Sequence, residues 1–180
     1  GGAGRELHRR RPRGAGTVVS MSFDLDHVDR FVCGTVGPPG QRTFFLQAIA
    51  GTRAITLKME KQQVAVLADY LDRLLTNEEL PRDVADPGGP LAVPLEPEWA
   101  VGSMLVAVNE ATGRIVVIAR ELVADDDAEA DAAELRVALT PPQVVGFVDA
   151  ARVLVEGGRP ACRLCGRPID PEGHACPRWN

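Results

Sequence analysis

The sequence predicts an α+β fold in which two β-β-β-α units are followed by a C-terminal zinc knuckle. Short strand-like segments twice lead into a segment whose apolar residues recur at helical spacing. The two strand-to-helix junctions resemble each other at an offset of about 80 residues, as an internal repeat would produce. Cysteines and a histidine then gather near the end of the chain at spacings that suit a metal ion.

Three strands are predicted in the first unit, over residues 30–36, 43–50 and 53–60. The first two are rich in β-branched and aromatic side chains, and the third alternates apolar and polar residues. Residues 37–42, Gly-Pro-Pro-Gly-Gln-Arg, predict a turn between the first two strands. A phosphate-binding loop would need a lysine and a following helix, and this stretch has neither.

A helix is predicted over residues 61–75, because its apolar side chains share one face. That stripe consists of Val64, Leu67, Leu71 and Leu74. Proline and glycine are frequent from residue 81 to residue 97, which predicts a long surface loop. A loop of this length in a compact domain is often functional or mobile.

The second unit repeats this order, with strands predicted over residues 99–108, 114–123 and 135–139. The sequence Thr140-Pro-Pro-Gln143 is typical of a capping box with proline at the first helical position, so a helix should begin there. The apolar stripe of this helix consists of Val144, Phe147, Ala151 and Leu154.

The two helix starts match, since Gln63 and Val64 in one correspond to Gln143 and Val144 in the other. We interpret the match as an internal duplication, whose sheets pack together or join with pseudo-twofold symmetry. Chance similarity of two strand–helix junctions is the alternative. The expected organisation is one α+β domain with two halves and a metal-binding segment, over residues 21–156 (halves of about 23–80 and 98–156) and 157–180.

Residues 1–20 contain five arginines against one glutamate and few apolar side chains. Such a segment is expected to be a disordered basic tail, an expression-vector remnant, or the result of a start site assigned too far upstream, with Met21 as the natural first residue. A polyanion-binding arm is the alternative. The net charge of −5 argues against nucleic-acid binding by the whole surface of the protein. The sequence contains no run of 18 apolar residues, so no membrane span is predicted.

The residues of most defined chemistry are a Cys-x-x-Cys pair and a later His-x-Cys pair, and they form a Cys3His set: Cys162, Cys165, His174 and Cys176. Gly166 can adopt the positive φ of such a knuckle. Four protein ligands suit tetrahedral Zn²⁺ and leave no place for a catalytic water, so a structural zinc site is predicted. Redox chemistry at the Cys-x-x-Cys pair and a disulfide are the alternatives. A chain that uses three of its four cysteines in this way is expected in a reducing cytoplasm.

Catalytic machinery is not apparent, and no catalytic residue is predicted. Apart from His8 in the tail and His174 in the metal set, His27 is the one candidate base, and Cys33 is expected to be a small buried hydrophobic residue. The predicted binding residues surround the knuckle instead, where arginines and a tryptophan could grip a protein partner or single-stranded nucleic acid, or serve solubility alone. They are Arg159, Arg163, Arg167, Arg178 and Trp179.

Several motifs resemble those of an uncharacterised family of actinobacterial proteins. They include Arg42-Thr-Phe-Phe-Leu-Gln47, Glu98-Trp99-x-Val-Gly102 and Asp170-Pro-Glu-Gly-His174-x-Cys176-Pro. The resemblance extends from about Phe23 to Arg178; Arg163 departs from it, where proline is expected. It implies a cytoplasmic domain of unknown function whose members are often encoded near genes for a mycothiol-pathway ligase, a histidine phosphatase and a kinase-like protein, and it implies no activity.

The leading functional hypothesis is a non-enzymatic cytoplasmic adaptor that binds a protein partner through the zinc knuckle. Binding of single-stranded nucleic acid by the same knuckle is the first alternative. An enzyme acting on a phosphorylated or thiol metabolite, with Gln63 and Glu60 or Arg42 and the turn at 34–43, is the second.

Overall fold

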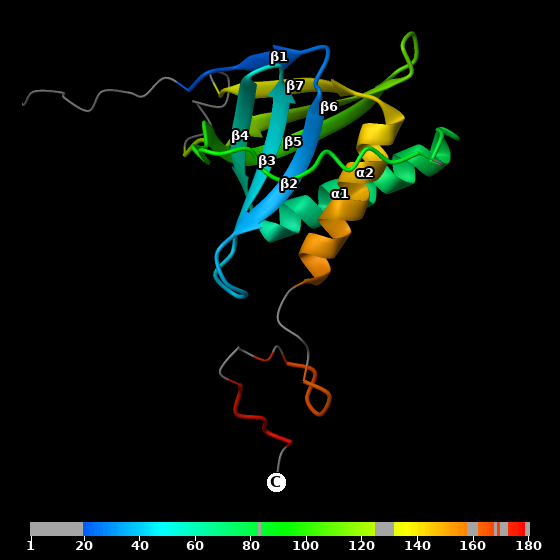
Figure 1. Ribbon diagram of the computed structural model, residues 1–180. Coiled ribbons are helices and arrows are strands. Elements are labelled where there is room, and N and C mark those ends of the chain that lie inside the picture. The colour runs from blue at the N-terminus through cyan, green and yellow to red at the C-terminus, as the bar shows by residue number, and fades with distance from the viewer. Residues whose placement is uncertain are drawn as a thin grey trace, which may run out of the picture.

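The structure is a computed structural model that describes residues 20–82, 84–124, 132–157, 162–167, 169 and 173–178. Its elements are β1 (Phe23–Leu25), β2 (Arg30–Val36), β3 (Thr43–Ala50), β4 (Arg53–Met59), α1 (Lys61–Asn77), β5 (Trp99–Asn109), β6 (Arg114–Glu121), β7 (Glu134–Leu139) and α2 (Pro141–Glu156). The predicted α+β class is confirmed, with β1 as an additional strand (Figure 1). Neither of the described helices is long and apolar enough to cross a membrane.

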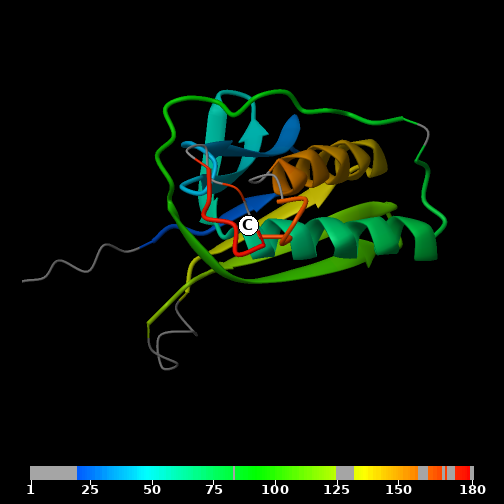
Figure 2. The same ribbon diagram turned by 90° about the horizontal axis from the view of Figure 1, so that it is seen from below.

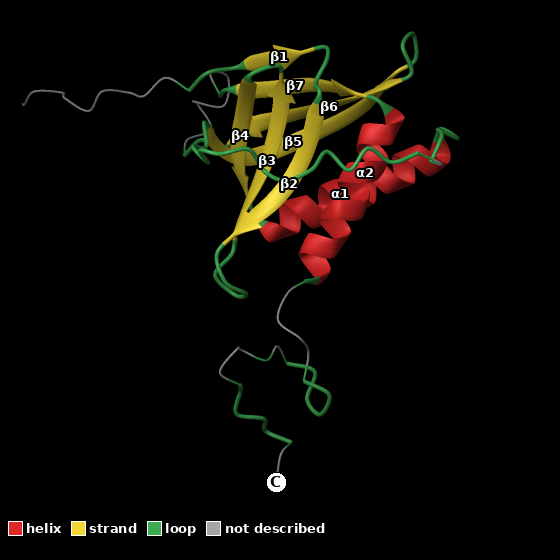
Figure 3. Cartoon of the chain, in the orientation of Figure 1, coloured by secondary structure: helices red, strands yellow, loops and turns green. Residues whose placement is uncertain are grey.

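The strands form one seven-stranded sheet in the order β1-β7-β6-β5-β4-β3-β2 (Figure 3). Neighbouring strands are antiparallel, except that β4 and β5 are parallel, as are β1 and β7. Strands β2 to β7 therefore lie in sequence order, and the second β-β-β unit follows the first along the same sheet. Corresponding strands of the two units also run in the same directions. Common origin of the two units stays a prediction.

The sheet has to curl, because its two edge strands are close neighbours in the chain. Strands β1 and β2 lie at opposite ends of the strand order, yet residues 26–29 alone connect them. Such a link spans at most about 17 Å. The sheet therefore bends until its edges approach each other, and Figure 2 shows this curvature together with both helices.

Helix α2 lies where the two edges of the sheet approach each other. It packs against β2, and the rings of Phe147 in α2 and Phe31 in β2 have centroids 5.0 Å apart. The buried side chain of Gln143 donates from Nε2 to the carbonyl oxygen of Val28, in the link between the edge strands, at 2.8 Å. One side chain thus fixes the start of α2 to the connection that closes the fold.

Both predicted helical stripes are buried in one hydrophobic core, apart from Leu74 and Leu154, which are half-buried at its margin. Helix α1 extends two residues beyond the prediction, to Asn77. The helices contact each other, and on their outer side Arg152 of α2 donates to Asp72 of α1 at 2.7 Å. Charge-assisted hydrogen bonds from Arg152 and, to a smaller extent, from Arg82 lower the pKa of Asp72.

The predicted capping box at the start of α2 is confirmed. The backbone N–H of Thr140 donates to Gln143 Oε1 at 3.0 Å, and the N–H of Gln143 donates to Thr140 Oγ1 at 3.4 Å. At the start of α1, the N–H of Glu60 donates to Gln63 Oε1 at 2.9 Å. Gln63 also donates to the backbone of a neighbouring strand, as Gln143 does to that of the link, so the match between the two junctions extends to their hydrogen bonds.

The predicted loop between α1 and β5 is irregular in structure, but it is packed against the sheet. We call residues 84–97 the strap; in Figure 1 it passes α2, where the N–H of Asp86 donates to the carbonyl oxygen of Pro142, and then crosses β2 and β3. The fully buried side chain of Gln47 in β3 accepts from the N–H of Ala92 at 2.7 Å and donates to its carbonyl oxygen at 2.9 Å. Leu91 lies directly over Gly34, and so the strap buries the second face of these strands.

Replacement of Gly146 by alanine tests this packing, because the two relevant effects have opposite signs. Alanine ordinarily stabilises a helix interior by about 1 kcal/mol relative to glycine. In α2, however, a Cβ at position 146 would overlap the carbonyl oxygen of Asp86 in the strap. We expect Gly146→Ala to lower the free energy of unfolding by about 1–3 kcal/mol, measured by urea denaturation.

The control is Val153→Ala, at an exposed position of the same helix, which should leave stability unchanged or slightly raised. A Gly146→Ala protein at least as stable as the wild type would contradict the close approach of the strap to α2.

Candidate metal centre

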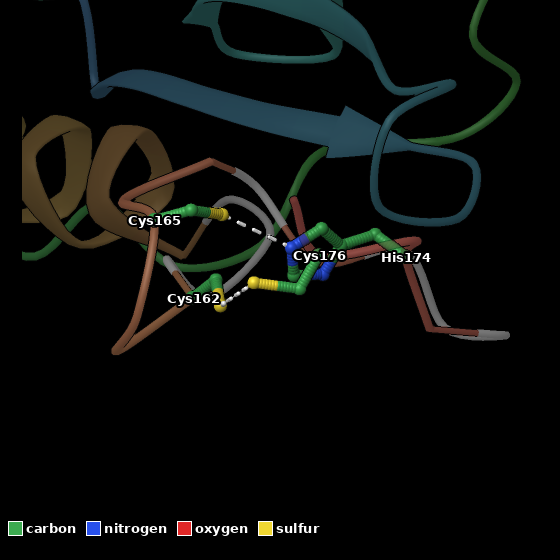
Figure 4. Close-up of side chains that lie close together, drawn as sticks. All are labelled: Cys162, Cys165, His174 and Cys176. Atoms are coloured by element: carbon green, nitrogen blue, oxygen red, sulfur yellow. Dashed lines mark hydrogen bonds between the residues drawn. The ribbon is translucent and has the colours of Figure 1, made fainter. Parts of the chain in front are cut away.

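The predicted metal ligands come together in the segment that follows α2. One donor atom from each of Cys162, Cys165, His174 and Cys176 lies within 4.8 Å of every other. The side chains point toward one another (Figure 4). The Sγ atoms of Cys162 and Cys176 are 3.8 Å apart, and Sγ of Cys165 is 3.2 Å from Nε2 of His174.

A tight turn positions the first two ligands. The N–H of Gly166 donates to the carbonyl oxygen of Cys162 at 2.8 Å, and the N–H of Cys162 donates to that of Arg167 at 2.8 Å. Gly166 has φ +72°, as predicted, a conformation that other residues adopt at a cost. The Cys-x-x-Cys-Gly order therefore folds locally into a turn that brings both thiols to one side.

The geometry fits a tetrahedral metal ion. Two sulfurs bound at about 2.3 Å to such an ion lie about 3.8 Å apart, which matches the separation of the Cys162 and Cys176 sulfurs. Hydrogen bonds from the backbone N–H of Cys165 and then of Leu164 lower the pKa of Cys162, which favours the thiolate that a metal requires. Desolvation raises the pKa of Cys176. Four protein donors complete a tetrahedral set without a water ligand.

The predicted binding residues are described in part. Arg163 and Arg167 are exposed beside the turn, and the exposed Arg178 donates from Nη1 to the carbonyl oxygen of Leu164 at 3.2 Å. Arg159 and Trp179 lie outside the described residues. Three of the five predicted residues therefore border the metal centre.

The geometry does not support His27 and Cys33 as a base and nucleophile. Burial raises the pKa of Cys33 to about 12, so its thiol is neutral at physiological pH, as expected of a small core residue. His27 is exposed, and its Nε2 lies 3.6 Å from Oδ1 of Asp29. Among the described residues, the partner of this imidazole is a carboxylate and not a nucleophilic hydroxyl or thiol.

A groove between α1 and β5 was not predicted. It has a volume of about 500 Å³ and is lined by residues 102–106 of β5 and by five residues of α1: Gln62, Gln63, Val66, Leu67 and Tyr70. Tyr70, a phenol, is the one titratable side chain among these lining residues, which include no carboxylate, amine, imidazole or thiol. Gln63 uses both ends of its amide on the backbone of Glu60 and Val101, so its role is structural.

A model of the family described as "Protein of unknown function (DUF3090)" matches residues 23–176. The chain belongs to this family. The match begins at the first residue of β1 and ends at Cys176, so it includes the sheet, both helices and all four predicted ligands. The predicted membership of a family of unknown function is thus confirmed for this DUF3090 chain. The actinobacterial origin and the gene neighbours stay predictions. Neither the curated proteins nor the solved structures contain a match.

Metal binding is expected to depend on Cys165 and not on Cys33. Cys165→Ser removes one of four ligands and should weaken Zn²⁺ binding more than about 100-fold, since changes in outer-shell partners alone cost 10–100-fold. Competition with a chromophoric chelator measures the affinity, and elemental analysis gives the stoichiometry.

Cys33→Ala is the matched control, because it removes a buried thiol that is not one of the clustered donors, and it should retain one equivalent of metal. Equal Zn²⁺ affinity in the Cys165→Ser and Cys33→Ala proteins would contradict the ligand assignment.

Proposed function

We propose that this DUF3090 protein is a non-enzymatic cytoplasmic adaptor, in which a structural Zn²⁺ ion orders the C-terminal segment that binds a protein partner. The observation that carries the proposal is the convergence of four donor atoms within 4.8 Å. The sheet and helices form the support, and the described residues from 162 to 178 form the binding module.

Zinc is the metal that this donor set favours. Three thiolates and one imidazole are soft or borderline ligands, which select Zn²⁺ over Mg²⁺ or Ca²⁺. A closed set of four such ligands is typical of structural zinc sites, which contribute to folding rather than to catalysis. The turn with Gly166 supplies few apolar contacts of its own, so metal ligation is the natural source of its stability.

The surface around the site supports a protein partner. Leu164, at the tip of the turn, is 51% exposed and lies between the exposed Arg163 and Arg167 in sequence. Among the described residues, no ion pair engages either of these arginines. An apolar side chain flanked by available guanidinium groups suits an acidic partner surface with an apolar centre.

The available guanidinium groups also support the first alternative, binding of single-stranded nucleic acid. Phosphate contacts make such binding steeply dependent on salt, whereas an apolar anchor makes protein binding less so. The enzymatic alternative has the least support, because Tyr70 carries the one titratable side chain among the residues that line the groove.

Charge reversal at the turn is expected to weaken partner binding without unfolding the protein. The zinc-loaded chain is immobilised, a retained protein is identified and purified, and its affinity is measured by interferometry. Arg163→Glu combined with Arg167→Glu should weaken binding at least tenfold, because charge complementarity becomes repulsion. Cys165→Ser should have the same effect through loss of the metal.

The matched control is Arg73→Glu, which reverses an exposed arginine of α1 and should leave affinity unchanged. Unchanged binding in both the Arg163→Glu/Arg167→Glu protein and the Cys165→Ser protein would contradict the adaptor proposal. Binding of labelled single-stranded RNA or DNA that falls steeply between two salt concentrations, and is lost in the same variants, would favour the nucleic-acid alternative.

A further inference from the structure

Strand β5 has a long edge that no strand of the described chain pairs with. Its contact with β4 covers Trp99 and Ala100 alone, because β4 ends at Met59 and the chain turns directly into α1. From Val101 to Asn109, β5 pairs with β6 on one side, and the other side faces the groove beside α1. Gln63 donates from Nε2 to the carbonyl oxygen of Val101 at 2.8 Å. This is the closed end of the edge, next to the residues that pair with β4.

Most of this edge lacks the features that usually prevent association. Exposed sheet edges are commonly protected by charged side chains, proline or a covering segment. Residues 101–108, Val-Gly-Ser-Met-Leu-Val-Ala-Val, contain neither charge nor proline. The register irregularity near Gly102 lies at the closed end and leaves the rest of the strand regular.

The groove provides room for the side chains of an added strand. On the α1 side it presents Val66, 52% exposed, and Tyr70, 47% exposed, and on the strand side it presents Leu105, 58% exposed. In Figure 2, α1 and β5 run side by side. A strand paired with β5 would place alternate side chains against α1, over Val66 and Tyr70, and its other side chains beside Leu105 on the opposite face.

We propose that a second copy of this chain adds its own β5 to this edge, antiparallel and about a twofold axis at Leu105. In this register Val101 lies opposite Asn109 of the second copy, and Leu105 lies opposite the same residue of its mate. Met104 and Val106, which are half-buried on the core side, become cross-strand neighbours next to α1. Each copy buries the unpaired edge of the other.

Two features favour a second copy as the occupant. In this register each β4 lies beyond the end of the partner strand rather than in its path, so the two free edges can pair from Val101 to Asn109. The edge is also uncharged along its length, so identical strands meet without like-charge repulsion. The dimer is independent of the metal centre and of the adaptor proposal.

Leu105 provides the test, because the twofold axis places it opposite itself. Light scattering with gel filtration should give the wild-type chain twice its mass of 19.3 kDa. Leu105→Lys and Leu105→Glu should each be monomeric, since like charges then lie directly opposite each other. An equimolar mixture of the two variants should return to the dimeric mass, because each lysine then faces a glutamate.

The control is Val153→Lys, which introduces the same charge at an exposed apolar position of α2 and should leave the protein dimeric. A wild-type chain that is monomeric at about 100 µM, well above the Kd of a stable dimer, would overturn the proposal and leave the edge to an extended peptide of another protein. A dimer unaffected by Leu105→Lys, or variants that do not recombine on mixing, would overturn it as well.

Discussion

Residues 26–29, which join the two edge strands of a seven-stranded sheet, are the constraint on which the body of the molecule depends. So short a link allows no flat sheet, and the right-handed twist of the strands accumulates into a deep curve. Helix α2 packs beside the link, and Gln143 satisfies the carbonyl of Val28 that would otherwise be buried without a donor. The curve encloses one core shared by both helices.

The strap and the metal centre are two different solutions to the problem of ordering a segment with few apolar residues. The strap is fixed by buried polar groups, chiefly the amide of Gln47, and by the absence of a side chain at Gly34 and Gly146. The segment from 162 to 178 has no such support from the sheet among its described hydrogen bonds, and its own ligands must hold it.

Local features were predicted well from the sequence. The strands over 30–36 and 43–50 have the predicted bounds, because their composition and the turn between them are local signals. Cys162 and Cys165 were recognised for the same reason, since one turn brings them together. Strand β1 was missed because three residues carry no periodicity, and the strand order depends on parallel pairs that no local pattern specifies. The groove arises because β4 ends at Met59, whereas β5 continues to Asn109 beside α1. This difference in length depends on how α1 connects the two strands in space, which no local pattern specifies.

We expect the metal centre to fold separately from the sheet and helices, which do not need the metal. Hydrogen–deuterium exchange of the full chain tests this expectation most directly, measured with Zn²⁺ bound and again after a chelator has removed the metal. The structure predicts that protection at the hydrogen-bonded amides of Cys162 and Gly166 is lost with the metal, while β2, β3 and both helices keep theirs. Loss of protection throughout the sheet and helices, or unchanged exchange at Cys162 and Gly166, would contradict this account.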